Sequence, residues 1–117
     1  MGYDDSSIAM VKAKKFALDA IAVYKILLRN NEFVLSRQFL RSATSVGANI
    51  KEALRGQSRA DFGAKMNIAL KEACETEYWL ELLTESGYLT DGSRLLADNK
   101  ELIKILYSIV KTTFNNK

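Results

Sequence analysis

The sequence predicts an all-α protein, an up-down-up-down antiparallel four-helix bundle, and three observations support this. Apolar residues recur at alternating spacings of three and four along most of the 117 residues, which is the period of an α-helix. The chain has no proline and only six glycines, so few breaks interrupt the helices. The connections between the periodic segments are only a few residues long, and helices joined so closely fold back on their neighbours.

Residues 1–117 are predicted to form a single domain, because chains of about 100 to 200 residues usually build one core. No internal repeat, low-complexity segment or linker divides the sequence. The periodic segments place the four helices at approximately residues 7–30, 36–55, 59–86 and 92–114.

The first helix is expected to begin after Ser6 and Ser7, whose hydroxyl groups can cap a helix start. Its core face is predicted from apolar residues at helical spacing, namely Ala13, Ala17, Ile21, Tyr24 and Leu28. A second set of apolar residues makes this face wider than packing against one neighbouring helix requires, namely Phe16, Ala20, Val23 and Leu27. Such a surplus of apolar surface favours self-association.

The other three helices show one regular core face each. Ser36 is the cap candidate of the second helix, and its predicted core residues are Phe39, Ala43, Val46, Ile50 and Ala53. Ser58 and Asp61 resemble a capping box at the start of the third helix. The core residues of the third helix are predicted to be Phe62, Met66, Ala69, Ala73, Thr76, Leu80 and Leu83. Those of the fourth helix are Leu95, Leu102, Ile103, Leu106, Ile109 and Val110.

The composition excludes most common enzyme chemistry. The chain contains no histidine, which excludes Ser-His-Asp and Cys-His nucleophiles and every His-ligated metal site. The single cysteine, Cys74, cannot form an internal disulfide. We therefore expect no enzyme, no catalytic residue, no metal and no cofactor. The N-terminus lacks a secretory signal pattern, and no apolar run could span a membrane, so a cytoplasmic protein is expected.

The net charge of +3 hides two helices of opposite sign. The second helix carries one acid, Glu52, against four bases on a predicted outward stripe, which are Arg37, Arg41, Lys51 and Arg55. The third helix carries three bases against six acids over residues 57–86. The sequence leaves three explanations of the basic stripe open. The stripe either pairs with neighbouring helix faces, contacts an acidic face of another subunit, or contacts nucleic-acid phosphates.

The outer side of the third helix is the predicted oligomer interface. Three glutamates recur at four-residue spacing, namely Glu77, Glu81 and Glu85. Like charges at this spacing repel and favour an opposing basic surface, either on a neighbouring helix of the same chain or on another subunit. Apolar residues extend beyond the core stripe of this helix, namely Ile68, Tyr78, Trp79 and Leu82. This is more apolar surface than one small core needs. The alternative is a wide core that absorbs Trp79 together with Phe16 of the first helix.

A narrow polar stripe lies between the core side and the basic side of the second helix, formed by Gln38, Ser42, Ser45, Asn49 and Glu52. Small polar residues beside a core usually hydrogen-bond a neighbouring helix and thereby fix its register. We interpret this stripe as a structural polar network, and a catalytic role is the less favoured interpretation.

Residues 38–53, QFLRSATSVGANIKEA, resemble the central motif of the 23S ribosomal RNA intervening-sequence proteins. The resemblance continues through residues 61–62, 68–73 (IALKEA), 75–80 (ETEYWL) and 87–89 (GYL). It implies an antiparallel four-helix bundle that assembles into a homopentameric ring. A similar family, the accessory variability determinant proteins of diversity-generating retroelements, forms basic pentameric barrels that bind nucleic acid and a reverse transcriptase. The polar stripe, Arg41 and Lys51 match the family motif.

The leading hypothesis is a non-enzymatic homo-oligomer, pentameric by resemblance, whose basic stripe binds RNA or DNA backbone without sequence selectivity. The alternative is an oligomeric scaffold or adaptor for a protein partner, for example a reverse transcriptase. In that case the basic face of one subunit pairs with the acidic face of the next at the subunit interfaces.

Overall fold

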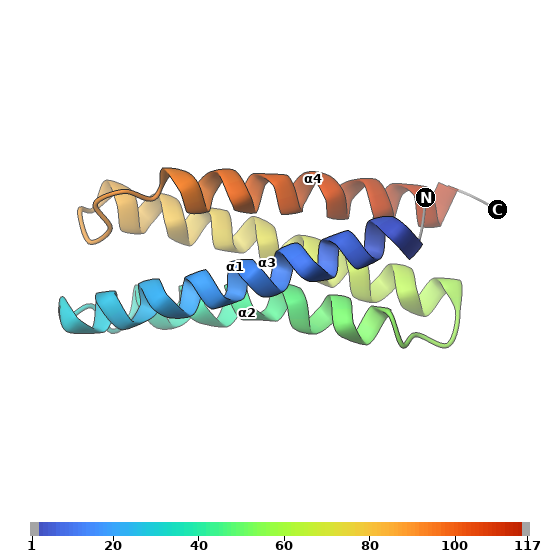
Figure 1. The fold of residues 1–117 in the computed structure, drawn as a ribbon, viewed down its shortest axis with the longest axis horizontal. Coiled ribbons are helices and arrows are strands. Elements are labelled where there is room, and N and C mark those ends of the chain that lie inside the picture. The colour runs from blue at the N-terminus through green and yellow to red at the C-terminus, as the bar shows by residue number, and fades with distance from the viewer. Residues whose placement is uncertain (1–2, 116–117) are drawn as a thin grey trace.

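The computed structural model describes residues 3–115 and places four α-helices along one long axis (Figure 1). They are α1 (Tyr3–Arg29), α2 (Leu35–Ala53), α3 (Arg59–Glu85) and α4 (Ser93–Asn115). Consecutive helices run in opposite directions, so α1 begins and α4 ends at the same end of the molecule. The predicted fold class, an all-α up-down-up-down antiparallel four-helix bundle, is confirmed.

The helices form a ring of four neighbours in chain order. Each packs against the next, and α4 closes the ring against α1. Helices α2 and α3 share the most extensive contact, whereas α1 and α4 share the least. Among residues 3–115 the diagonal pairs, α1 with α3 and α2 with α4, make no close backbone contact. The bundle measures 49 × 21 × 19 Å. Because the four helices form a ring, each helix has its outer face on a different side of the bundle.

The core face of α1 differs from the predicted one. Phe16, Ala20 and Leu27 are buried in the core, whereas Ile21 is 37% exposed. The set that the sequence indicated as surplus thus builds the core, together with Ala13 from the other set. The cause is that two apolar stripes share this helix, and both follow the helical period. Only the position of the neighbouring helices decides which stripe is buried.

The start of α1 also differs. This helix begins at Tyr3, so Ser6 and Ser7 lie inside it and do not cap it. Ser6 is buried. One half of the predicted capping box of α3 is present, because the hydroxyl of the N-cap Ser58 accepts the Asp61 N–H at 3.0 Å. The Asp61 carboxylate accepts the N–H of Gln57 at 3.2 Å, one residue before the N-cap whose N–H a complete capping box would bind.

Helix α2 is capped by Glu32, a residue that the sequence did not single out. Its buried carboxylate accepts backbone N–H groups of Val34, Leu35 and Ser36. These are free donors at a helix start, which an anionic acceptor satisfies. Asn31 adopts a φ of 64°, and this left-handed turn lets the Glu32 N–H return to the carbonyl of Leu27 at 3.0 Å. Ser36 therefore lies inside the first turn and is not the cap.

Candidate nucleic-acid interface

The outward side of α2 carries exposed bases, as the sequence indicated, but they fall into two groups. Arg37, Lys51 and Arg55 are exposed and make no ion pair with any residue of the described range 3–115. We call these three residues the basic face. Arg37 and Lys51 lie fourteen positions apart on α2, which corresponds to about 21 Å along the helix axis. Arg55 follows just beyond the helix end.

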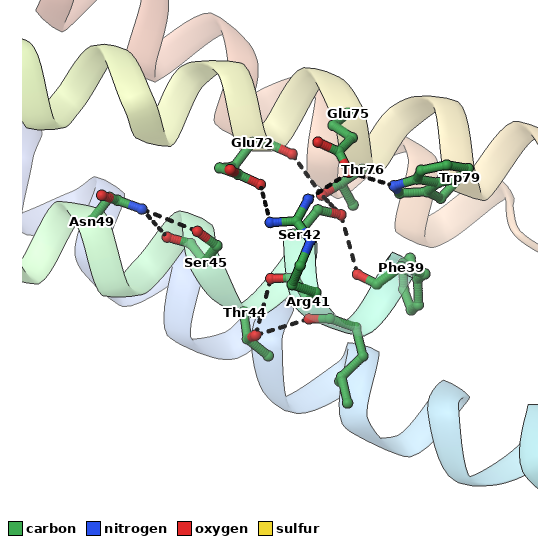
Figure 2. Close-up of polar contacts among 11 residues, drawn as sticks. Phe39, Arg41, Ser42, Thr44, Ser45, Asn49, Glu72, Glu75, Thr76 and Trp79 are labelled. Atoms are coloured by element: carbon green, nitrogen blue, oxygen red, sulfur yellow. Dashed lines mark hydrogen bonds and ion pairs between the residues drawn. The ribbon is translucent and has the colours of Figure 1, made fainter. Parts of the chain in front are cut away.

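Arg41 forms the second group, because it is bound to α3 (Figure 2). Its guanidinium lies 3.2 Å from a carboxylate oxygen of Glu72 and donates a hydrogen bond to Glu75. The hydrogen bond with Glu75 raises the pKa of Arg41, burial opposes this, and the charge of Glu72 adds to it. Two carboxylates therefore already neutralise the charge of Arg41. The sequence did not indicate this pairing, because it requires the register between α2 and α3.

Glu75 joins this ion pair to the only tryptophan of the chain. The indole N–H of Trp79 donates to Glu75 Oε2 at 2.8 Å. Hydrogen bonds from Trp79 and Arg41 hold the pKa of the Glu75 carboxyl below its ordinary value, against the opposing effect of burial. Glu75 is therefore anionic at neutral pH and keeps both Arg41 and Trp79 in place.

The acid of α2 does not neutralise the basic face. Glu52 lies on the side of α2 toward α3, where its carboxylate accepts a hydrogen bond from Lys65 Nζ at 2.8 Å. This contact raises the pKa of Lys65. The outward side of α2 thus presents Arg37, Lys51 and Arg55 beside small side chains, Thr44 and Ala48, with the one acid paired elsewhere. Such a surface favours an anionic partner.

The polar stripe of α2 divides into three kinds of contact. Ser42 alone reaches across to a buried partner, since Thr76 Oγ1 lies 2.8 Å from its Oγ. Asn49 bonds within its own helix, donating to the carbonyl and hydroxyl oxygens of Ser45 (Figure 2). Glu52 pairs with Lys65, as described above. Gln38 is exposed and has no side-chain partner within residues 3–115.

The residues predicted for the oligomer interface lie on α3 with different exposures. Tyr78 is 54% exposed and Ile68 41% exposed, whereas Leu82 and Trp79 are half-buried. The rings of Tyr78 and Trp79 are 5.4 Å apart and tilted by 55°. Trp79 also packs against the core, so the core absorbs part of this side chain.

The acidic residues of the predicted interface do not meet the basic face of α2 within one chain. Glu81 and Glu85 are exposed and Glu77 is half-buried. None of the three makes an ion pair within the described range. Their charges are therefore available to another molecule.

Comparison with known proteins gives a family. The family model described as 23S rRNA-intervening sequence protein matches residues 6–108. The chain belongs to this family. The match extends over all four helices and confirms the resemblance carried by the α2 motif.

A relative with a solved structure supports the assignment of the chain to this family. It is the crystal structure of a protein of unknown function from the S23 ribosomal protein family of Bacteroides thetaiotaomicron. The two chains are 50% identical, the alignment covers 92% of this chain and 99% of that one, and the TM-score is 0.89. A comparison with curated proteins found no match.

Two further structural facts concern the residues that the structure describes. They contain no group of three or more cysteine, aspartate or glutamate side chains placed to hold a metal ion. None of the helices in this range is long and apolar enough to cross a membrane.

Proposed function

We propose that this 23S rRNA-intervening sequence protein is a non-enzymatic, cytoplasmic homo-oligomer that binds the phosphate backbone of RNA or DNA through the basic face of α2. The observation that carries the proposal is the state of Arg37, Lys51 and Arg55, which are exposed and free of ion pairs. The family name refers to 23S ribosomal RNA, which makes RNA the first ligand to test. A pentameric ring is the assembly that the family resemblance suggests.

The proposed mechanism is release of counterions from the phosphates. Each phosphate that a lysine or arginine neutralises releases counterions. The logarithm of the affinity therefore falls linearly with the logarithm of the salt concentration, and each contact with B-form DNA contributes about −0.9 to the slope. Three bases without nearby unpaired acids give a slope of about −3 for each subunit that touches the duplex. The face carries no aromatic side chain on which bases could stack, so weak sequence preference is expected.

Fluorescence anisotropy with a labelled 20-base-pair RNA duplex, repeated with the same sequence as DNA, tests the proposal. Titrations run between about 50 and 200 mM NaCl, where phosphate contacts lose affinity steeply. Arg37→Gln, Lys51→Gln and Arg55→Gln should each weaken binding and reduce the salt slope by about 0.9. Arg41→Gln should change the slope less, because Glu72 and Glu75 already hold Arg41.

Lys100→Gln is the matched control. Lys100 is an exposed base of α4 with no ion pair among residues 3–115, on a different side of the bundle. Its loss changes the total charge by the same amount but leaves the basic face intact. Absence of binding at 50 mM NaCl, or an equal loss with Lys100→Gln, would contradict the proposed role of α2.

The second candidate is an oligomeric scaffold or adaptor for a protein partner, such as a reverse transcriptase, without a nucleic-acid role. It is favoured by the apolar side chains that remain exposed on α3, Ile68 and Tyr78 among them. Large exposed apolar residues beside polar ones are typical of protein interfaces. An oligomer that ignores both duplexes at low salt would select this candidate.

A further inference from the structure

Helix α1 has an apolar outer face that its own bundle leaves uncovered. Val11 is 70% exposed, Leu18 58%, Ile8 48% and Ile26 45%, and Ala22 is also exposed. These five residues recur mostly at spacings of three, four and seven, on the side opposite Phe16 and Leu27 in the core. We call them the α1 face. It extends over eighteen positions, about 27 Å along the helix axis.

The charges beside the α1 face are basic. Lys14, Lys25 and Arg29 are exposed and form no ion pair with other described residues. Lys15 pairs with Asp19 at 2.8 Å on the same helix, and this pair adds no net charge. A partner for this surface must therefore bring apolar side chains together with negative charge.

The outer side of α3 has both properties. Ile68 and Tyr78 are exposed and Leu82 is half-buried, while Glu81 and Glu85 beside them are exposed and free of ion pairs within the described part of the chain. We call these five residues the α3 face. Lys71, three positions after Ile68, is exposed beside them, so the surface carries two acids against this base and keeps a net negative charge. From Ile68 to Leu82 it extends over about 21 Å, which is comparable with the length of the α1 face.

The two faces cannot meet within one molecule. Helices α1 and α3 are diagonal in the bundle, so their outer faces point in opposite directions. Contacts between two α1 faces would bring lysines and an arginine together, and contacts between two α3 faces would bring glutamates together. Like charges placed against each other are unfavourable, so the α1 face of one copy fits the α3 face of another copy best.

We propose that the α1 face of one chain docks on the α3 face of a second copy. The inference rests on the self-association included in the proposed function and adds the surfaces that form the contact. Such a contact joins different surfaces of the two copies, so each dimer keeps one free α1 face and one free α3 face for further growth. It also leaves Arg37, Lys51 and Arg55 of α2 uncovered. The basic face then remains accessible in the assembly.

A complementation experiment tests this pairing by light scattering and sedimentation equilibrium. Leu18→Glu places an acid in the α1 face, and Tyr78→Glu places a further acid in the α3 face. Both residues are more than half exposed, so the bundle itself should keep its helicity and melting temperature. Each variant alone should have the mass of one chain. An equimolar mixture should form dimers, because the intact α1 face of Tyr78→Glu can dock on the intact α3 face of Leu18→Glu.

Tyr107→Glu is the matched control, because Tyr107 is an exposed tyrosine of α4 outside both faces, with 57% exposure against 54% for Tyr78. This variant should keep the mass of the wild-type assembly. Mixtures are measured up to about 0.5 mM, because a single contact without ring closure binds more weakly than a closed assembly.

The outcomes separate this inference from the proposed function. A wild-type assembly that persists in both variants, or a mixture that stays monomeric, overturns the pairing of the α1 and α3 faces. Self-association would still stand in the first of these cases. A monomeric wild type overturns both the pairing and the oligomer. Binding of the RNA duplex is a separate measurement that depends on α2.

Discussion

Thr76 Oγ1 lies 2.8 Å from Ser42 Oγ, at a point of the α2–α3 contact where both residues are fully buried. Each hydroxyl also has a backbone partner. Ser42 donates its hydroxyl proton to the carbonyl of Phe39. The single hydroxyl proton of Thr76 is shared between two acceptors, Ser42 Oγ and the carbonyl of Glu72. The pair therefore joins the two helices without an unsatisfied group, and such buried polar contacts fix one register of packing.

We expect Thr76→Val and Ser42→Ala each to lower the free energy of unfolding by about 1 kcal/mol. Each change removes one hydrogen bond across the helices, but the remaining hydroxyl keeps its backbone acceptor. The double variant should lose less than the sum of the single changes, because the shared bond is lost only once. Urea unfolding of all four proteins measures this coupling. Strict additivity would show that the contact contributes nothing to stability.

Helix α2 depends on the Glu32 carboxylate, and this dependence predicts a response to pH. Burial alone would raise the pKa of Glu32, but hydrogen bonds from the N–H groups of Ser36, Leu35 and Val34 outweigh it and lower the pKa below its usual 4.5. A carboxyl with a lowered pKa in the folded state stabilises the protein above its unfolded pKa, and this stabilisation is lost as pH falls through the folded value.

The comparison of wild type with Glu32→Gln isolates this effect. Between pH 6 and 8 the wild type should be more stable by a constant difference in the free energy of unfolding. The difference should shrink as the pH falls below about 4.5, since protonated Glu32 accepts the N–H groups less strongly. Chemical unfolding at several pH values measures it. A difference that does not change with pH would contradict a capping role for the charged carboxylate.

The family motif and the helical period are enough to predict the fold, but they do not determine how the helices face one another. The period predicts four helices and, from the short connections, their antiparallel order. On α1, however, the stripe with Phe16 and the stripe with Ile21 are both regular, and the sequence favoured the wrong one. The exposed Val11 and Leu18 belonged to neither predicted stripe. The α1 face therefore became visible only once the neighbouring helices were placed.

The candidate site shows the same limit. Exposure of Arg37 and Lys51 follows from the helical period of α2 alone. The engagement of Arg41 depends on which acids of α3 lie opposite it, and these are Glu72 and Glu75. Glu77, Glu81 and Glu85 recur more regularly in the sequence than Glu72 and Glu75, but their side of α3 does not face α2. Which residues pair across two helices depends on how each helix is oriented about its own axis. The spacing of residues along one helix does not determine this orientation.

The link between Arg41, Glu75 and Trp79 predicts a spectroscopic titration. Trp79 is the only tryptophan, so its fluorescence reports on the carboxylate that its N–H contacts. The Trp79 hydrogen bond and Arg41 both lower the pKa of Glu75, and Arg41→Gln removes the second of these contributions. The acidic midpoint of the fluorescence change should therefore move to higher pH in Arg41→Gln.

The cost of Arg41→Gln in stability should be at most about 1 kcal/mol, because the Arg41 side chain is 49% exposed and water screens the pair. Arg37→Gln provides the control, since Arg37 lies on the same helix and has no contact with Glu75. It should leave the fluorescence midpoint unchanged. An equal shift in both variants would indicate a general charge effect and would contradict the specific pairing.

Two buried helical glycines should respond in opposite ways to alanine. A Cβ added to Gly47 would lie 3.5 Å from Met10 Cε and 3.6 Å from Ala13 Cβ, which is ordinary packing distance. Alanine is favoured over glycine inside a helix by about 0.5 to 1 kcal/mol. Gly47→Ala should therefore raise the melting temperature by about 2 to 6 °C.

A Cβ added to Gly63 would lie only 2.6 Å from Cζ of Phe114, so the aromatic ring must move away from α3. Gly63→Ala should therefore gain less stability than Gly47→Ala, or lose some, because displacement of the ring offsets the gain in helix propensity. In a Phe114→Ala background the obstacle is absent, and Gly63→Ala should then stabilise by about 0.5 to 1 kcal/mol. Thermal unfolding of the four combinations at Gly63 and Phe114 measures this. If Gly63→Ala has the same effect in both backgrounds, the Phe114 ring does not limit the space at Gly63.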